Sequence, residues 1–489
     1  MGIENIEHVV VVMFENRSFD NLLGWLYDNA SNPPKFNIPA QDPPTFDGLQ
    51  ANTYYNSLNG TQYQVVRGTT AALCCPNRNQ VPTPDPQEEF VHVTEQLFGT
   101  QTPAAGQTAD MSGFLQDYST TSAGTASATQ IVQTYGPEQA NVINGLARNF
   151  AVCDRWFASV PTQTWPNRGF VHTGSSDGHI NNDNYEWYDI PTIYNILQAQ
   201  GKSWNVFHDS ELIPSLTLWQ FPQAGSMRGN FKSYGEFKNC CAAAANADPA
   251  TKLPAYSFVE PRFVAELFVA QPSDYHPPHN ICRGETFLAD MYQAVRNSPY
   301  RDKIMLIVTF DEHGGCYDHV PPPTGAAAPQ PSPRSRDNSF GFDRFGVRVP
   351  AIVISSYVEP GTVFRAANSE APYDHTSILA TVRDWPFLGL NKANFLPSPR
   401  IAAAPTLDRV LTRAAGNENT NWPDVQPQCT IDGSDVSQDT PLNDLQKSLL
   451  AGAKALNTDT PPAVAAQQAK QLVTYQHGGE FMQPFATGN

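Results

Sequence analysis

Two apolar runs constrain the fold most, because each ends directly in acidic or amide side chains. They are residues 9–14 (VVVVMF), followed by Glu15 and Asn16, and residues 304–310 (IMLIVTF), followed by Asp311 and Glu312. A continuous apolar run of this length is typical of a strand buried on both faces of a parallel sheet. The chain is therefore expected to form an α/β protein.

Further segments repeat this alternation of strand and helix. Residues 349–355 (VPAIVIS) form a third strand-like run, and residues 284–296 (GETFLADMYQAVR) show helical periodicity directly before the second strand. A second helix is expected over residues 376–384, with Asp374 as a plausible N-cap. This order favours a doubly wound, mostly parallel sheet flanked by helices.

Long loops are expected around this core, because the chain of 489 residues contains 42 prolines and 32 glycines. Insertions rich in Pro, Asn and Gln are expected near residues 30–110, 205–275 and 321–340 of a catalytic region that covers residues 1–400. Residues 401–489 are expected to pack on that core or to form a partner surface, with one helix over residues 441–456.

Charge and hydropathy exclude some classes of partner. The formal charge of −17 repels polyphosphate backbones, so nucleic acid is not expected as a ligand. No run approaches the ~20 apolar residues that span a bilayer, which leaves peripheral contact as the expected relation to a membrane. The N-terminus shows no signal-peptide pattern, so a cytoplasmic protein is expected, or a secreted or periplasmic one whose signal was removed.

The eight cysteines show no spacing that suits zinc or redox chemistry. Two vicinal pairs, Cys74-Cys75 and Cys240-Cys241, accompany four isolated cysteines, and no C-x-x-C motif occurs. Reduced, structural thiols are the favoured interpretation.

The polar residues at the two strand ends form a candidate metal site. Ligands in open α/β sheets lie beyond the carboxyl ends of the strands, so the two pairs of side chains are expected to converge. Carboxylate and amide oxygens suit one divalent cation such as calcium, magnesium or manganese. For either pair alone, capping residues or a solvated acidic turn is the simpler interpretation.

Thr164 is the candidate nucleophile. It lies in residues 159–174 (SVPTQTWPNRGFVHTG), just before Pro166, where a helix start is expected to leave amide donors free. A cation and a helix N-terminus would both stabilise the charge on an attacking hydroxyl oxygen. An ordinary N-cap threonine is the alternative.

Histidines gather in three further segments. His276 and His279 lie in YHPPHN, His313 and His319 in DEHGGCYDHV, and His375 in DHTS. Imidazoles can hydrogen-bond a phosphoryl group and transfer a proton near neutral pH. Any one of them taken alone fits a loop or core histidine as well.

Together these segments resemble a known family. The characteristic stretches are residues 15–20 (ENRSFD), 111–114 (MSGF), 164–168 (TWPNR), 275–280 (YHPPHN), 311–323 (DEHGGCYDHVPPP), 340–344 (FGFDR) and 346–350 (GVRVP). The chain resembles the phosphoesterase family of bacterial and plant non-specific phospholipases C and related acid phosphatases. This resemblance implies an alkaline-phosphatase-like fold.

The resemblance also implies roles for individual residues. It places the metal on Glu15, Asn16, Thr164, Asp311 and Glu312, with Thr164 as nucleophile. It assigns the phosphate and the leaving group to His276, His279 and His375, and further substrate contacts to His313 and Arg168. Glu88 departs from the pattern, because relatives that resemble the plant enzymes often carry histidine there.

The implied activity is metal-dependent hydrolysis of phosphate esters through a phospho-threonine. A phospholipase C that releases diacylglycerol and a phosphorylated head group is preferred, and an acid phosphatase acting on monoesters is the alternative. From another class, a non-catalytic binding protein stabilised by a metal remains open. The sequence predicts no particular oligomeric state.

Overall fold

The computed structural model describes residues 2–28, 32–68, 79–121, 124–182, 187–210, 213, 215–265, 271–431, 436–458 and 460–486. The vicinal pair Cys74-Cys75 lies outside these residues.

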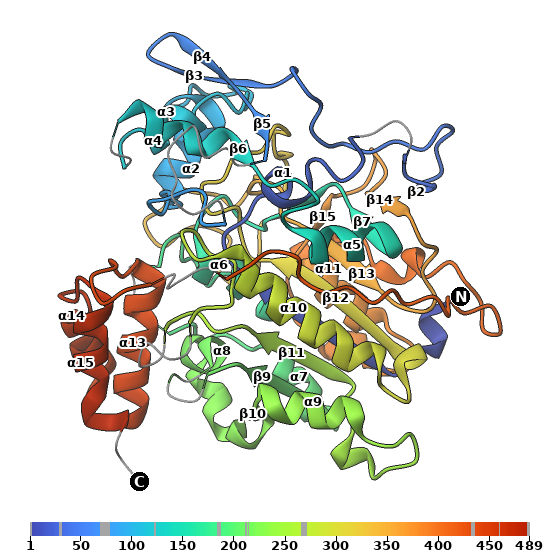
Figure 1. Cartoon of the computed structure of the whole chain (residues 1–489). Coiled ribbons are helices and arrows are strands. Elements are labelled where there is room, and N and C mark those ends of the chain that lie inside the picture. Colours follow the sequence, from blue (N-terminus) through green and yellow to red (C-terminus); the bar gives the residue numbers. More distant parts are fainter. Residues whose placement is uncertain are drawn as a thin grey trace.

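A nine-stranded sheet forms the centre of the protein (Figure 1). Its strands are, in spatial order, β10 (Phe231–Ser233), β9 (Trp204–His208), β11 (Tyr256–Glu260), β1 (His8–Phe14), β12 (Ile304–Phe310), β13 (Ala351–Ile354), β7 (Ala151–Cys153), β14 (Thr362–Phe364) and β2 (Phe36–Ile38). All residues of β1 and β12 are buried, as expected for central strands covered on both faces.

The sheet is mostly parallel. Six of its eight neighbouring pairs are parallel, and β13 runs antiparallel to both β12 and β7. This confirms the predicted α/β class with a mostly parallel sheet, and residues 349–355 contain the one strand of this sheet, β13, that runs against both of its neighbours. An apolar run predicts that a strand is buried on both faces, but it does not predict whether the strand is parallel or antiparallel to its neighbours.

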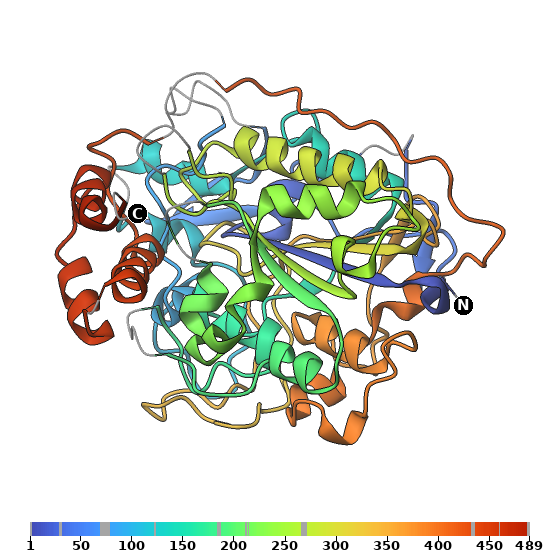
Figure 2. The same cartoon turned by 90° about the horizontal axis from the view of Figure 1, so that it is seen from below.

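Helices cover both faces of the sheet (Figure 2). One face carries α5 (Asn141–Asn149), α9 (Tyr234–Ala242) and α10 (Ile281–Arg296), and the other carries α6 (Thr164–Thr173), α7 (Ile193–Ala199) and α11 (Thr376–Asp384). The helix expected over residues 376–384 has those bounds. The helix expected over residues 284–296 begins three residues earlier, at Ile281. Asn280 is its N-cap residue, and the Asn280 side-chain oxygen accepts a hydrogen bond from the Cys282 N–H.

The other elements are short and surround the strand ends. The helices are α1 (Phe19–Leu23), α2 (Phe90–Phe98), α3 (Phe114–Tyr118), α4 (Thr125–Ala128), α8 (Leu216–Gln220) and α12 (Pro399–Ala403). The strands are β3 (Tyr55–Leu58), β4 (Thr61–Gln64), β5 (Val66–Arg67), β6 (Gln133–Thr134), β8 (Trp156–Phe157) and β15 (Tyr373–Asp374).

Three C-terminal helices lie together at one end of the molecule, far from the N-terminus (Figures 1 and 2). They are α13 (Asp444–Asn457), α14 (Pro462–Ala469) and α15 (Tyr475–Ala486). Leu445 and Leu449 of α13 belong to one buried apolar cluster with Trp219 and Phe263 of the preceding chain. The Trp165 indole N–H also donates to Ser448 Oγ at 3.0 Å, so α13 packs next to the start of α6.

A disulfide joins Cys282, in the first turn of α10, to Cys429. The expectation that all cysteines are reduced was therefore wrong for this pair, whose partners lie 147 positions apart in sequence. Among the described residues, Cys153, Cys240, Cys241 and Cys316 are buried free thiols. Sequence spacing could not reveal the pair, because only the fold brings the two residues together.

None of the described helices combines the length and apolar character that a bilayer span requires.

Candidate active site

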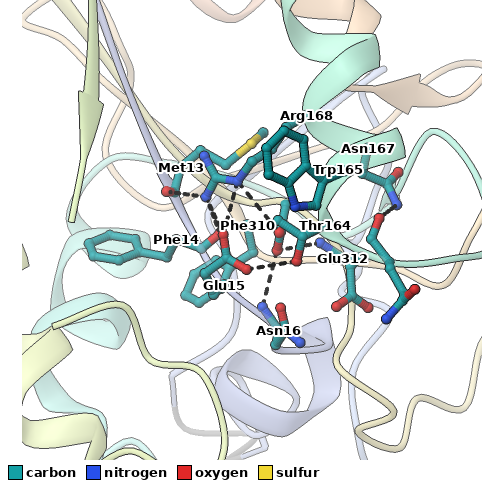
Figure 3. A network of polar contacts seen from close by, with 12 residues as sticks. Met13, Phe14, Glu15, Asn16, Thr164, Trp165, Asn167, Arg168, Phe310 and Glu312 are labelled. Atoms are coloured by element: carbon teal, nitrogen blue, oxygen red, sulfur yellow. Dashed lines mark hydrogen bonds and ion pairs between the residues drawn. The ribbon is translucent and has the colours of Figure 1, made fainter. Parts of the chain in front are cut away.

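The register of the two central strands brings the predicted ligands together. Phe14 pairs with Phe310, so the residues that follow them leave adjacent strands side by side (Figure 3). Asn16 N–H donates to Asp311 Oδ1 at 3.1 Å, which joins the two strand ends directly. Asn16 adopts a left-handed backbone with φ of 56°, a conformation that asparagine tolerates better than most residues.

Thr164 is the first residue of α6 and points into this cluster (Figure 3). Its hydroxyl donates to Glu15 Oε2 at 2.9 Å, and both side chains are fully buried. Free amide donors were expected at this helix start, but the Trp165 N–H is already bound by Asn182 Oδ1 at 2.8 Å. The partner is supplied by a loop that follows the helix, so the local sequence could not indicate it.

Arg168 lies one turn further along α6, behind Glu15. Its Nε donates to Glu15 Oε1 at 2.9 Å, and its Nη2 donates to the same oxygen and to the Met13 carbonyl at 3.0 Å. Phe263 covers the guanidinium at 5.0 Å from the ring centre. Arg168 was expected to contact substrate; here it is the buried counter-ion of Glu15, and substrate contact stays a prediction.

The other predicted ligands keep oxygens free for a cation. Asn16 Oδ1, Asp311 Oδ2 and Glu312 Oε1 are buried and accept no hydrogen bond. Asp311 Oδ2 has only a longer ion pair, with Arg168 Nε at 3.7 Å. A buried oxygen without a hydrogen bond is costly, and three of them at the joined strand ends fit a hard divalent cation. The donor set therefore suits the predicted metal.

The electrostatics of the cluster agree with this fit. Burial and the charge of Asp311 raise the pKa of Glu15 well above its usual range, and the same two causes raise the pKa of Glu312. Close carboxylates cannot all ionise without a compensating positive charge. Arg168 supplies one such charge to Glu15, and a bound cation would supply the rest.

A second acidic group stands close enough to suggest a metal site. Among the described residues, ligand atoms of Asp20, Asp318 and His319 lie within 4.8 Å of one another. The Arg348 guanidinium binds both carboxylates of this group. Its Nη2 donates to Asp20 and its Nε donates to Asp318, each at 2.9 Å. Burial lowers the pKa of His319, but the Asp20 carboxylate helps raise it to about 9, which favours a protonated imidazole paired with Asp20.

We expect Asp318→Asn to destabilise the protein without changing its metal content. The substitution leaves Arg348 with one carboxylate where it had two, and breaking a buried ion pair costs about 3 kcal/mol. Denaturant unfolding measures this loss. Asp290→Asn, in an exposed ion pair with Lys238, is the control and should change the unfolding free energy by less than about 1 kcal/mol.

His276 and His279 follow β11 and lie close together, with ring centres 5.7 Å apart. The Asp274 carboxylate accepts a hydrogen bond from His279 Nδ1 at 2.7 Å. The Asp274 carbonyl in turn accepts from Glu15 N–H at 2.9 Å, which links this segment to the acidic cluster. Sequence reasoning missed Asp274, although its position just before the YHPPHN segment was a usable signal.

His375 and His313 contact the predicted metal ligands Asp311 and Glu312 rather than open space. His375 Nε2 donates to the Asp311 carbonyl at 2.5 Å, and its Nδ1 accepts from the Trp156 indole at 3.3 Å. His313 Nε2 pairs with the Gln96 side chain at 2.7 Å. Burial lowers the pKa of His375 to about 4 and that of His313 to about 3. Both rings are therefore neutral, and their roles at the phosphate stay predictions.

A cavity of about 690 Å³ opens beside the cluster. It reaches Gln163, the residue before Thr164, and His279. Its wall comes from both the core and the C-terminal helices, and its charged residues are all acidic: Asp85, Glu88, Glu89 and Asp444. The Glu88 position noted in the sequence thus belongs to the wall of this cavity.

These features form a buried acidic site, and sequence similarity identifies the family to which the chain belongs. Residues 6–385 match the phosphoesterase family, and the chain belongs to this family. It is 32% identical to non-specific phospholipase C3 of Arabidopsis thaliana over 466 residues, which cover 93% of this chain and 83% of the relative. Phospholipase C A of Mycobacterium tuberculosis is 27% identical over 78% of this chain and 72% of that relative. The protein is a phosphoric ester hydrolase.

Solved structures show a more distant likeness. A phosphonate monoester hydrolase of Agrobacterium radiobacter matches with a TM-score of 0.33 and 14% identity, over 59% of this chain and 75% of that one. A protein of the alkaline phosphatase superfamily from Vibrio parahaemolyticus matches with a TM-score of 0.30 and 13% identity, over 50% and 60%. The family assignment rests on the sequence relatives.

Proposed function

We propose that the protein is a phospholipase C that cleaves phosphodiesters through a covalent phospho-threonine at Thr164. The observation that carries this proposal is the Thr164 hydroxyl at 2.9 Å from Glu15 Oε2, inside a cluster of free acidic and amide oxygens. A nucleophile needs a proton acceptor within hydrogen-bond reach, and Glu15 provides one.

In the first displacement, Thr164 Oγ attacks phosphorus while its proton passes to Glu15. The bond from phosphorus to the diacylglycerol oxygen breaks, and that oxygen takes a proton from solvent in the cavity. The phosphorylated head group is then attached to Thr164. Arg168 holds Glu15 in position throughout, because both of its bonds to Glu15 come from a fixed guanidinium plane.

In the second displacement, water attacks the same phosphorus and the bond to Thr164 Oγ breaks. The threonine oxygen recovers its proton from Glu15, and the proton lost by water passes through the site to solvent. The products are diacylglycerol and a phosphorylated head group. Because two in-line displacements occur, configuration at phosphorus is retained overall.

The metal proposed here is one divalent cation, held by Glu15, Asn16, Thr164, Asp311 and Glu312. When bound, such an ion offsets negative charge on the phosphoryl oxygens. The free oxygens named above support it; calcium, magnesium and manganese are all compatible with that donor set.

The cavity favours a diester over a monoester. A monoester phosphatase has to hold one substituent, whereas the cavity of about 690 Å³, which reaches Gln163 next to Thr164 in the sequence, can receive a second one. Initial rates on phosphatidylcholine and on para-nitrophenyl phosphate separate the two activities. Brisk monoester turnover with negligible lipid turnover would instead identify an acid phosphatase.

A lipid substrate also implies peripheral contact with a membrane.

The acidic wall predicts the charge of the preferred head group. Burial raises the pKa values of Glu88 and Asp85 well above their usual range, and the charge of Asp85 adds to the effect on Glu88. A cationic substituent would offset this crowding of carboxylates, so we expect phosphatidylcholine to be cleaved with about 10-fold higher kcat/KM than phosphatidylglycerol. Glu88→Gln should reduce this ratio several-fold. Glu95→Gln on α2, outside the cavity wall, is the control. If the ratio of the two kcat/KM values is the same in Glu88→Gln and in the wild type, Glu88 does not contribute to head-group selection.

A further inference from the structure

The N-terminus of α13 lies directly over the two histidines that follow β11. Asn443 Nδ2 is 3.1 Å from His276 Nε2, and Gln446 Nε2 is 3.2 Å from His279 Nε2. His276 and His279 are at most 2% exposed, and Gln446 lines the cavity beside His279. A segment 167 residues away in sequence thus covers the ring nitrogens of both histidines.

The orientation of the two amides is fixed by the helix itself. Asn443 Oδ1 accepts from Gln446 N–H at 2.8 Å, and Gln446 Oε1 accepts from Asn443 N–H at 3.1 Å, which forms a capping box. Each side-chain oxygen is therefore committed to the helix backbone. The NH₂ groups therefore face the histidines, and an NH₂ group can only donate. Gln446 Nε2 has two hydrogens for three acceptors, and after the Tyr475 hydroxyl the His279 nitrogen at 3.2 Å is nearer than the Phe263 carbonyl at 3.4 Å.

The other ring nitrogens show where the histidine protons lie. His279 Nδ1 is 2.7 Å from an oxygen of the Asp274 carboxylate, which accepts only. His276 Nδ1 is 2.6 Å from the Pro277 carbonyl, which also accepts only. Each Nδ1 therefore carries a proton and each Nε2 presents a lone pair. Burial also lowers the pKa of His276 well below its usual value, which favours a neutral ring.

The packing of α13 is firm enough to hold these contacts. Leu445 and Leu449 are 2% exposed or less, and Gln446 also donates to the Tyr475 hydroxyl at 2.5 Å. The same amide lies 3.4 Å from the carbonyl of Phe263, whose ring covers Arg168. The helix is therefore tied to the wall that also supports the acidic cluster.

We propose that Asn443 and Gln446 are positioning residues, which make α13 part of the active site by holding His276 and His279 with Nδ1 protonated and Nε2 available as a proton acceptor. The catalytic part of this inference rests on the proposed function. It revises the role expected from the resemblance, because an imidazole in this form accepts a proton before it can deliver one.

The reaction step that fits this arrangement is the second displacement. His279 Nε2 takes a proton from the attacking water as the new oxygen–phosphorus bond forms and the bond to Thr164 Oγ breaks. Gln446 must release Nε2 when water or substrate enters the cavity. The proton on His279 then returns to solvent.

Two substitutions test the positioning role while preserving the helix cap. Asn443→Ser keeps an N-cap oxygen but loses the amide donor, and Gln446→Glu keeps the capping box but places an acceptor opposite His279. Nitrogen NMR of ¹⁵N-histidine protein, assigned with His276→Gln and His279→Gln, reports the tautomers. Asn457→Ala, which removes an amide at the far end of the same helix, is the control.

We expect the wild type and the control to show Nδ1 protonated at both histidines. Gln446→Glu should protonate His279 Nε2 and lower kcat on a soluble diester about 10-fold with KM changed less than about 3-fold. Asn443→Ser should change the His276 signals alone. Nε2 protonated in the wild type, or unchanged histidine signals in both variants, would overturn the proposal. The tautomers are read without any reaction, so a protein that proves inactive on phosphate esters refutes the proposed function separately.

Discussion

Thr164→Val is expected to reduce turnover of phosphodiesters by about 10⁴-fold or more while leaving the fold intact. Valine matches threonine in shape but lacks the hydroxyl that bonds Glu15, so no covalent intermediate can form. The side chain is fully buried, and the volume of the site stays the same. Steady-state rates and the unfolding midpoint of the purified variant measure the two effects.

Thr173→Val is the matched control, because it makes the same change at the other end of α6. The Thr173 hydroxyl lies 2.7 Å from the Ser175 carbonyl and 3.0 Å from the Gly169 carbonyl, and it has no contact with Glu15. Turnover should remain within a few-fold of the wild type. If Thr164→Val also turns over at the wild-type rate, Thr164 is not the nucleophile; an N-cap role is no alternative, because the N-cap of α6 is Gln163.

Asp311→Asn is expected to abolish metal binding and to lower the turnover rate by about 10³-fold. Asp311 Oδ1 accepts two backbone N–H groups, from Asn16 and Glu312, and an amide oxygen can still accept them. The substitution removes the charge and the Oδ2 ligand, together with the ion pair between that oxygen and Arg168 Nε at 3.7 Å. The metal-free variant should be at least as stable as the metal-free wild type, because one of three crowded carboxylates is gone.

Metal titration followed by thermal unfolding separates these contributions. A cation at 100 times its dissociation constant stabilises the wild type by about 2.7 kcal/mol, whereas Asp311→Asn should show almost no increase. Asp318→Asn should respond to metal like the wild type. A normal metal response in Asp311→Asn with none in Asp318→Asn would place the ion in the Asp20, Asp318 and His319 group instead.

The centre of the fold and of the site could be predicted from local patterns. The runs 9–14 and 304–310 fall within β1 and β12, and residues 376–384 form α11, because strong periodicity and buried β-branched runs determine local structure. Since parallel strands end at one edge, the pattern also indicated that Glu15 and Asp311 converge. The hydrogen bond from Asn16 to Asp311 agrees with that expectation.

Other features depend on partners that are distant in sequence. The sequence around Arg168 does not show that the guanidinium donates hydrogen bonds to Glu15. The sequence around Trp165 does not show that its backbone N–H donates to the side chain of Asn182. The capping box of Asn443 and Gln446 was recognisable at the start of a predicted helix, but its contact with two histidines was not. Such contacts arise from tertiary packing, which local propensity does not encode.

The stereochemical course at phosphorus tests the central claim most directly. A phosphorothioate diester of known configuration is hydrolysed in ¹⁸O-water, and the configuration of the released phosphorothioate monoester is determined. Attack by Thr164 followed by water gives two inversions, so net retention is predicted. Net inversion would show that water attacks the substrate directly, and it would contradict a covalent phospho-threonine.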